Sequence, residues 1–251
     1  MTLSLALVQA VGIGLMLGFL ITTMSAGGGI LAVPLMQFFL KLSHTEAVAT
    51  SLAGVLGAAL VGIVGHARAG RVVFRVAAIF APTAMLGSFA GAKLHGFLPE
   101  SVTLSLFALL LLFAAWRMTK PPPVALSAEV TPRYALWAAT GAAVGVLGGL
   151  FGVGGGFLFV PTLVLWVGLP IKHAVGTATL IIAASSLSGA ATYALDGALE
   201  AQTLVPVSLA AVVGALLGLP AVGRLPDQVL RRVFSGLAAI AALATLARAW
   251  F

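Results

Sequence analysis

The stretch GGGFLFVP at residues 154–161 recurs earlier in the chain as GGGILAVP at residues 27–34. Each copy leads into an apolar run, about 28–40 and 155–167, that is too short to cross a bilayer comfortably. Three consecutive glycines are poor helix formers, so they predict an interruption of the helix. Proline is tolerated in the first turn of a helix. Each copy therefore predicts a helix that starts between its glycines and its proline, from about residue 30 in the first.

The composition around these motifs indicates a bilayer environment. Of 251 residues, 61% are hydrophobic and 8% are charged, whereas a soluble domain carries about 25% charged residues. The net charge of +7 comes from basic residues in short connections between apolar runs, which is typical of membrane orientation rather than nucleic-acid binding. The chain contains no cysteine, which excludes disulfides and thiolate chemistry. We expect an all-α integral membrane protein with the lipid bilayer as its main partner and no nucleic-acid partner.

Eight further apolar runs are long enough to span a bilayer. The first has no basic region before it, so we expect it to be a helix of the mature protein rather than a cleaved signal. The eight runs cover about 3–24, 47–65, 72–92, 101–118, 133–151, 174–195, 202–223 and 229–250.

The two halves of the chain align without a gap when one is shifted by 127 residues. The register pairs glycines, two prolines, two threonines and the acids that start the last helices: Gly14/Gly141, Gly18/Gly145, Gly27–Gly29/Gly154–Gly156, Pro34/Pro161, Thr50/Thr177, Gly62/Gly189, Gly87/Gly214, Gly91/Gly218 and Glu100/Asp227. We expect a first transmembrane repeat at 1–118, a cytoplasmic linker containing three prolines at 119–132, and a second repeat at 133–251.

Charge in equivalent loops predicts that the two repeats are inverted. The loop near Arg68, Arg71 and Arg75 is basic, whereas its counterpart holds Asp196 and Glu200 and no basic residue. Basic loops face the cytoplasm, so equivalent loops should lie on opposite sides. Inversion requires an odd number of crossings per half. We therefore expect five apolar segments per repeat, four long helices and one short glycine-started half-helix, with both termini outside the cytoplasm.

A helix that starts at membrane depth presents free amides and a partial positive charge to whatever lies in front of it. Two such termini approaching from opposite sides would suit a small anion. The alternative is that the glycines only let helices pack closely, which we favour for the spaced pairs such as Gly14/Gly18 and Gly87/Gly91. For the triple glycines we favour the binding site.

Polar side chains within the apolar runs are uncharged. Ser43 and Glu46 have the spacing of a capping box that opens the next helix. Thr50 and Thr177 are equivalent in the two repeats and are expected in the first turn of a helix, where their hydroxyls, with that of Ser51, could donate to a ligand. No metal-ligand pair, nucleophile elbow or phosphate loop is present. We expect neither an enzyme nor a cofactor or metal site.

The motif order resembles that of the TauE/SafE sulfite-exporter family of bacterial membrane permeases. A Gly-Gly-Gly-x-x-x-Val-Pro run is followed by Ala-Val-Gly-Thr, as at 154–161 and 174–177, and the first copy departs slightly, with Ala-Val-Ala-Thr-Ser at 47–51. The resemblance implies a multi-pass protein of the bacterial cytoplasmic (inner) membrane that moves sulfite, sulfonates or other small organic anions, usually outward. It implies a binding site made of Gly27, Gly28, Gly29, Pro34, Thr50, Gly154, Gly155, Gly156, Pro161 and Thr177, to which we add Ser51.

Three functions are consistent with this pattern. The first is a secondary transporter that exports a small sulfur-containing or carboxylate anion by alternating access. The second is a passive anion channel with the same site. The third is a membrane scaffold, which has no use for helices broken at depth. The sequence leaves open whether the protein forms a homo-oligomer.

Overall fold

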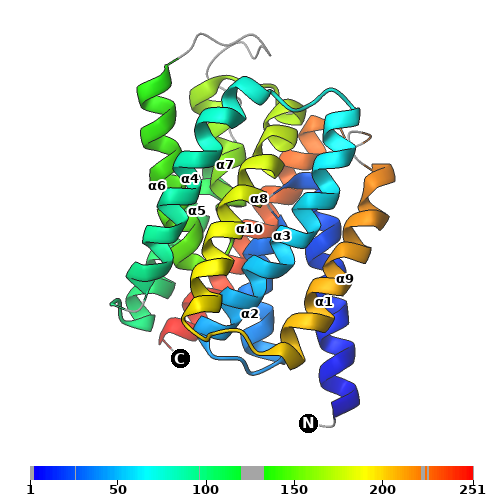
Figure 1. Cartoon of the computed structure of the whole chain (residues 1–251), viewed down its shortest axis with the longest axis vertical. Helices are drawn as coiled ribbons and strands as arrows, with labels where there is room; N and C mark the ends of the chain where they lie inside the picture. Colours follow the sequence, from blue (N-terminus) through cyan, green and yellow to red (C-terminus); the bar gives the residue numbers. More distant parts are fainter. Residues whose placement is uncertain are drawn as a thin grey trace.

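The computed structural model describes residues 3–25, 27–95, 97–119, 133–221, 224 and 226–250, and the regular elements in these ranges are helical (Figure 1). Apart from Thr119, the predicted linker at 119–132 lies outside the described residues. The elements are α1 (Leu3–Met24), α2 (Gly27–Phe39), α3 (His44–Arg68), α4 (Phe74–His95), α5 (Glu100–Thr119), α6 (Tyr134–Phe151), α7 (Gly156–Thr162), a π-helical turn (Leu163–Val167), α8 (Ile171–Leu195), α9 (Ala201–Gly218), a 3₁₀ turn (Leu219–Ala221) and α10 (Asp227–Trp250).

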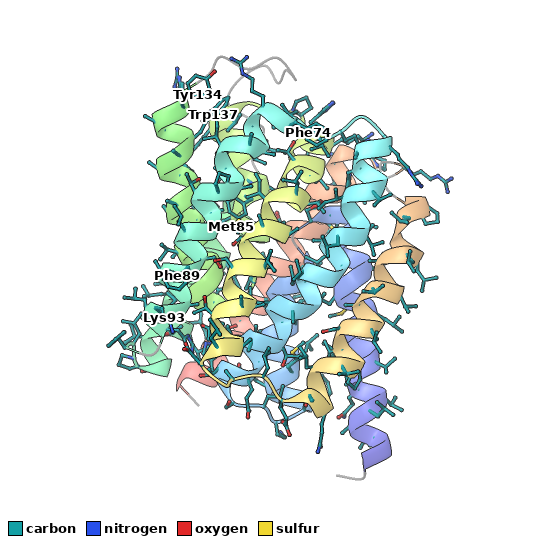
Figure 2. All side chains as sticks on the ribbon, in the orientation of Figure 1. Phe74, Met85, Phe89, Lys93, Tyr134 and Trp137 are labelled. Carbon is teal, nitrogen blue, oxygen red and sulfur yellow. The ribbon has the colours of Figure 1, made fainter. Side chains whose placement is uncertain are left out.

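All ten predicted apolar runs form helices. Six of them, α1, α3, α4, α6, α8 and α9, are long and apolar enough to cross a membrane within the described residues. Apolar side chains project from the outside of the bundle, as Phe89 of α4 does with 51% of its surface exposed (Figure 2). A bundle with such an outer surface needs lipid around it. The protein is therefore a multi-pass membrane protein.

Glycines form two close helix–helix seams, α1 against α9 and α4 against α6. A Cβ placed on Gly18 would overlap the carbonyl oxygen of Ala211 and lie 2.7 Å from its carbonyl carbon, and one placed on Gly145 would lie 2.8 Å from Cα of Ala84. Without a side chain at these positions, the helix backbones approach each other directly. The predicted packing role of the spaced glycines is confirmed.

Helices α3 and α8 form the centre of the bundle and pack antiparallel. A Cβ on Gly62 would lie 3.1 Å from Cγ2 of Thr179, and one on Gly189 would lie 3.0 Å from Cδ1 of Leu52. These two spans are the most buried of the six. Their facing surfaces are therefore shielded from lipid and are available for a polar site.

The start of α3 confirms one prediction and corrects another. The Ser43 amide donates to Oε2 of Glu46 at 2.9 Å, and the Glu46 amide donates to Oγ of Ser43 at 3.3 Å, which is the predicted capping box. The capping box starts α3 at His44. Helix α8 starts at Ile171. Thr50 and Thr177 therefore lie in the second turn of their helices, and the first-turn prediction is wrong.

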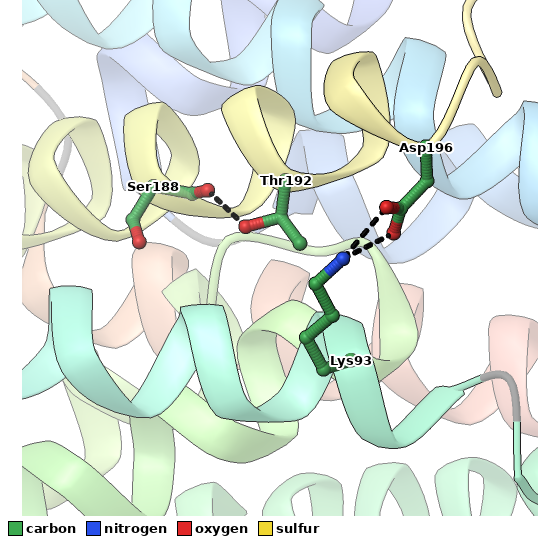
Figure 3. Close-up of polar contacts among 4 residues, drawn as sticks. All are labelled: Lys93, Ser188, Thr192 and Asp196. Atoms are coloured by element: carbon green, nitrogen blue, oxygen red, sulfur yellow. Dashed lines mark hydrogen bonds and ion pairs between the residues drawn. The ribbon is translucent and has the colours of Figure 1, made fainter.

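An ion pair joins the ends of α4 and α8. Nζ of Lys93 lies 2.6 Å from Oδ1 and 3.0 Å from Oδ2 of Asp196 (Figure 3). Thr192, one turn earlier on α8, instead donates to the Ser188 carbonyl at 2.9 Å. The side chains of Lys93 and Asp196 are 48% and 46% exposed, so water screens the pair.

We expect this ion pair to contribute little to stability. In a double-mutant cycle with Lys93→Gln and Asp196→Asn, the coupling in the free energy of unfolding should be about 1 kcal/mol or less. Thermal or denaturant unfolding of the purified protein in detergent measures it. A coupling of several kcal/mol would show that the pair is shielded from water in the membrane.

Candidate functional site

Helical structure is interrupted twice inside the bundle, and each interruption is called a break. Helix α1 ends at Met24, and Ser25 adopts a left-handed backbone with φ +56°. Helix α6 ends at Phe151, and Gly152, Gly154 and Gly155 follow with φ of +72°, +63° and +73°. Glycine adopts this conformation readily, whereas serine does so rarely. Both predicted interruptions are present.

The position of the glycines differs between the two breaks. Gly154 and Gly155 lie in the second break, and Gly156 is the first residue of α7. Gly27, Gly28 and Gly29 instead form the first turn of α2, so the prediction that the helix starts after them is wrong. The first-turn amides have no intrahelical partners in any helix, which makes this the turn where glycine is tolerated best.

The two breaks lie against each other. A Cβ on Gly29 would lie 2.9 Å from the carbonyl oxygen of Val153, and one on Gly156 would overlap the carbonyl oxygen of Ser25. Because neither glycine has a side chain, the starts of α2 and α7 meet at backbone distance. The structure thus brings together the two motifs that are 127 residues apart in sequence.

Helix α8 lines the first break with hydrogen bonds. Oγ of Ser25 lies 2.8 Å from the carbonyl oxygen of Val175 and against the hydroxyl of Thr179, whose Oγ1 lies 2.9 Å from the same carbonyl oxygen. Each hydroxyl has one hydrogen, so two hydrogens are shared among these three contacts. Ser25 and Thr179 have no exposed surface. This contact holds the end of α1 to α8.

Helices α3 and α8 line the second break. A Cβ on Gly152 would lie 2.6 Å from Cα of Val48, and one on Gly154 would lie 3.2 Å from Cγ1 of Val55 and would overlap Oγ of Ser186. Val48 and Val55 lie two turns apart on one face of α3. The second break is therefore enclosed between α3 and α8.

Two buried hydroxyls beside the second break have no hydrogen-bond partner. Ser186 contacts Gly154, and Ser51 lies on α3 between Val48 and Val55. Both serines are fully buried, and neither Oγ forms a hydrogen bond. A buried hydroxyl without a partner is unfavourable by about 1–3 kcal/mol and usually has a reason, such as a ligand. Ser51 belongs to the predicted site, and its role as a ligand stays a prediction.

The two predicted threonines are buried but are not equivalent in their bonding. Oγ1 of Thr177 accepts the amide of Val73 at 2.9 Å, which ties the start of α8 to the segment before α4. Thr50 is 1% exposed and lies one residue before Ser51. Thr177 therefore has an evident structural role, and Thr50 remains a predicted ligand.

The two predicted prolines do not line the breaks together with the glycines. Pro34 lies inside α2 and lines a hollow with Phe38 of α2 and Leu104 of α5. Pro161 lies inside α7, just before the π-helical turn, and lines a hollow with Phe113 and Trp166. Phe38, Phe113 and Trp166 are 59–67% exposed, so both hollows open to the outside of the bundle. The prolines shape the half-helices and do not face the breaks.

The sequence matches the family described as "Sulfite exporter TauE/SafE" over residues 10–245, which is most of the chain. The chain belongs to the TauE/SafE sulfite exporter family. Its relatives include the "Probable membrane transporter protein YdhB" of Bacillus subtilis, 31% identical, covering 93% of this chain and 96% of that protein. A "Probable membrane transporter protein" of Xylella fastidiosa is 28% identical, covering 98% of this chain and 97% of that protein. No solved structure matches the chain.

The TauE/SafE family is a membrane transporter family, so the polar groups near the breaks bear on a candidate ligand site. The described residues near them offer backbone amides and hydroxyls rather than charged groups. Among the described residues, no three histidine, cysteine or acidic side chains come together as a metal site.

Two residues of this TauE/SafE protein that line the breaks are absent from the predicted site. Ser25 precedes the first glycine run and takes the left-handed position that Gly152 takes in the second half. The 127-residue register aligns Ser25 with Gly152 and could have revealed it. Ser186 contacts Gly154 only because of the way α8 packs, and no sequence pattern predicts that contact.

Proposed function

We propose that this TauE/SafE protein exports a small sulfur-containing or organic anion, of the sulfite, sulfonate or carboxylate type, by alternating access. The anion would bind where the two helix breaks meet. The observation that carries the proposal is the pair of buried, unpartnered hydroxyls, Ser51 and Ser186, beside a left-handed glycine turn inside the bundle. A soluble anion that accepts hydrogen bonds is the ligand that would satisfy them.

The donor types favour an anion over a cation or an apolar solute. A helix start and a glycine turn present amide hydrogens, and serine hydroxyls can donate as well. Hydrogen bonds from neutral donors to a charged oxygen are stronger than those between neutral groups. Neutral donors also leave no unpaired positive charge buried when the anion has gone. The empty site can then change conformation without the cost of an unpaired buried charge.

Inverted repeats are part of the proposal, because they would give the protein two equivalent conformations facing opposite sides. The packing supports them. Helix α1 contacts α9 and α3, and its counterpart α6 contacts the counterparts α4 and α8. Helices α2 and α10 pack together, as do α7 and α5. Replacing each of these helices by its counterpart from the other half thus reproduces these pairings.

Backbone conformation supports the same relation. Six left-handed residues of the described chain form pairs separated by 127 positions, namely Ser25/Gly152, Lys41/Gly168 and Gly70/Gly197, whereas Gly154 and Gly155 correspond to the helical Gly27 and Gly28. In Figure 1, α1 runs upward from the lower end and α6 runs downward from the upper end. Five segments per half running in opposite directions are what an inverted repeat requires.

The distribution of charge supports an orientation. At the upper end in Figure 1, the segments from α3 to α4, from α5 to α6 and from α9 to α10 carry Arg68, Arg71, Arg75, Arg133 and Arg224. The connection from α8 to α9 at the lower end carries Asp196 and Glu200. By the positive-inside rule the upper end would face the cytoplasm and both termini the opposite side.

Removing the unpartnered hydroxyls should affect transport and stability in opposite directions. In Ser51→Ala and Ser186→Ala we expect the free energy of unfolding to be unchanged or raised, because a buried group without a partner is lost. Anion flux at low substrate concentration should fall by about 10–100-fold per variant, because a hydrogen bond to a charged ligand contributes about 1.5–3 kcal/mol. Flux into proteoliposomes and thermal unfolding measure the two effects.

Ser188→Ala is the matched control on α8. Its hydroxyl already donates to the carbonyl of Met85 at 2.8 Å, so its loss should leave flux unchanged. Wild-type flux in both serine variants would show that their hydroxyls do not touch the anion.

Accumulation separates a transporter from a passive channel with the same site. Proteoliposomes preloaded with sulfite or sulfoacetate should take up labelled anion against its gradient by exchange. Flux that only dissipates the gradient would favour the channel, and absence of any anion flux would contradict the proposed function.

A further inference from the structure

Side chains from neighbouring helices hold the last turns of α1 and α6, where the chain breaks. Nε2 of His66 in α3 lies 2.8 Å from the carbonyl oxygen of Thr22. Nδ1 of His95 in α4 lies 3.2 Å from the carbonyl oxygen of Leu150, and the Tyr193 hydroxyl donates to the carbonyl of Gly149 at 3.2 Å. The last carbonyls of a helix have no partner within it. Each broken helix is thus capped by a histidine from another helix.

The two histidine contacts lie at opposite ends of the bundle. His66 is in the last turn of α3. His95 is in the last turn of α4 and its ring packs on that of Tyr193, in the last turn of α8, with centroids 5.7 Å apart. Because α3 and α8 are antiparallel, their last turns face opposite sides of the membrane. The histidine bonded to α1 therefore lies toward one side of the membrane, and the histidine bonded to α6 lies toward the other.

The acceptors fix which ring nitrogen carries hydrogen. A carbonyl only accepts, so Nε2 of His66 and Nδ1 of His95 must be donors. Nδ1 of His66 is buried and has no hydrogen-bond partner, so it is the atom that a further proton would occupy. Nε2 of His95 lies 3.3 Å from Oγ1 of Thr45 and can accept from it. Both rings can therefore take up a proton without losing the carbonyl contact.

Proton uptake would change the hold on the broken helices. An imidazolium donates a stronger, charge-assisted hydrogen bond than a neutral ring, and the carbonyl end of a helix stabilises positive charge. Histidine is the side chain whose ordinary pKa lies nearest to neutral pH. Uptake of a proton would strengthen the hydrogen bond to the turn before each break, and release of the proton would weaken it.

The charged and titratable groups around each histidine are few. On the chain after His66 they are Arg68 and Arg71, and at the start of α8, which packs against α3, they are Lys172 and His173, while α1, α2 and α9 contain none. Near His95 they are the ring of His44, with centroids 5.1 Å apart, Tyr193, Glu46, and the Lys93–Asp196 pair. The basic neighbours oppose proton uptake, and the acidic ones favour it.

We propose that His66 and His95 are the proton-binding residues that couple anion transport to the proton gradient. The inference rests on the proposed function and adds the coupling ion to it. Each histidine would exchange protons with the water on its own side, and its protonation would set how firmly the adjacent broken helix is held.

The test compares wild-type protein with His66→Gln and His95→Gln in proteoliposomes. Glutamine can keep a donor for the carbonyl but cannot take up a proton near neutral pH. The probes are sulfite and sulfoacetate, the second because its charge does not change near neutral pH. For one proton per anion, a pH difference of one unit should drive about tenfold accumulation by the wild type. Each variant should lose this accumulation and keep anion exchange at equal pH on both sides.

His173→Gln is the control, because Nδ1 of His173 has no hydrogen-bond partner and so holds neither broken helix; its loss should leave the accumulation intact. Wild-type flux that is indifferent to the pH difference overturns the inference while leaving the proposed function standing. Variants that retain the full accumulation also overturn it. Absence of any wild-type anion flux overturns the proposed function, and this inference with it.

Discussion

Replacing Gly155 by leucine is expected to abolish anion flux while leaving the protein in the membrane. Gly155 has a left-handed backbone with φ +73°, where an L-residue is disfavoured by about 1–2 kcal/mol. A Cβ there would also lie 2.6 Å from the ring of Phe159, which is fully buried and cannot move aside freely. The larger side chain would displace the start of α7 from the break. We expect a loss of about 100-fold or more in initial rate, measured in proteoliposomes.

Gly168→Leu controls for backbone strain alone. Gly168 has a similar φ of +86°, and a Cβ there would meet nothing within 4 Å. It follows the π-helical turn at Leu163–Val167 and lies outside both breaks. This variant should lose some stability and retain flux. Equal losses of flux in the two variants would mean that Gly155 matters for folding only.

The Gly18→Leu substitution is expected to prevent stable folding. A Cβ at Gly18 would overlap the carbonyl of Ala211 and lie 2.7 Å from the amide nitrogen of Ala215. Backbone atoms cannot rotate away as a side chain does, so α1 and α9 would have to separate along their seam. We expect a destabilisation above the ~1–3 kcal/mol that is usual for an overpacked core. Size-exclusion chromatography and thermal unfolding in detergent measure the fraction of folded protein.

Gly12→Leu is the matched control in the same helix. Gly12 is exposed on α1, and a Cβ there would meet nothing within 4 Å. Leucine at this position would face lipid and should leave the yield of folded protein unchanged. Gly145→Leu should be as harmful as Gly18→Leu, because Gly145 packs on Ala84 as Gly18 packs on Ala211. Normal folding of both seam variants would contradict this account of the seams.

The sequence predicts this fold well because its strongest signals are simple. Apolar runs specify where helices cross, and glycines four residues apart specify where helices touch. The capping box at Ser43 also follows from local chemistry alone. The glycine runs correctly predict two breaks, because glycine in lipid is a poor helix former whatever surrounds it.

The details of the site depend on contacts that local patterns do not encode. The first glycine run is helical because the left-handed residue is Ser25, whose buried hydroxyl bonds to α8. That bond joins residues 150 positions apart in sequence. Ser186 faces Gly154 for the same kind of reason, since the register of α8 against the second break decides it. Thr50 and Thr177 are one turn deeper than predicted because their helices start at His44 and Ile171, before the apolar runs begin, and a capping box starts the first of them.

The contacts of the two histidines also could not be predicted from the sequence. His66 and His95 lie near helix ends, where histidine is usually an interfacial residue. Only the structure places their ring nitrogens on the carbonyls of Thr22 and Leu150, directly before the two breaks. Their importance follows from what they hold rather than from where they lie in the chain.

Binding of small anions to the purified protein tests the central claim most directly. A thermal-unfolding titration with sulfite, sulfonates and small carboxylates should raise the midpoint of the wild type saturably for at least one anion. The Ser51→Ala/Ser186→Ala double variant should fold normally and need a concentration at least about 10-fold higher for the same shift. If no anion shifts the wild-type midpoint, or if both proteins respond equally, the anion does not bind at the meeting point of the two breaks.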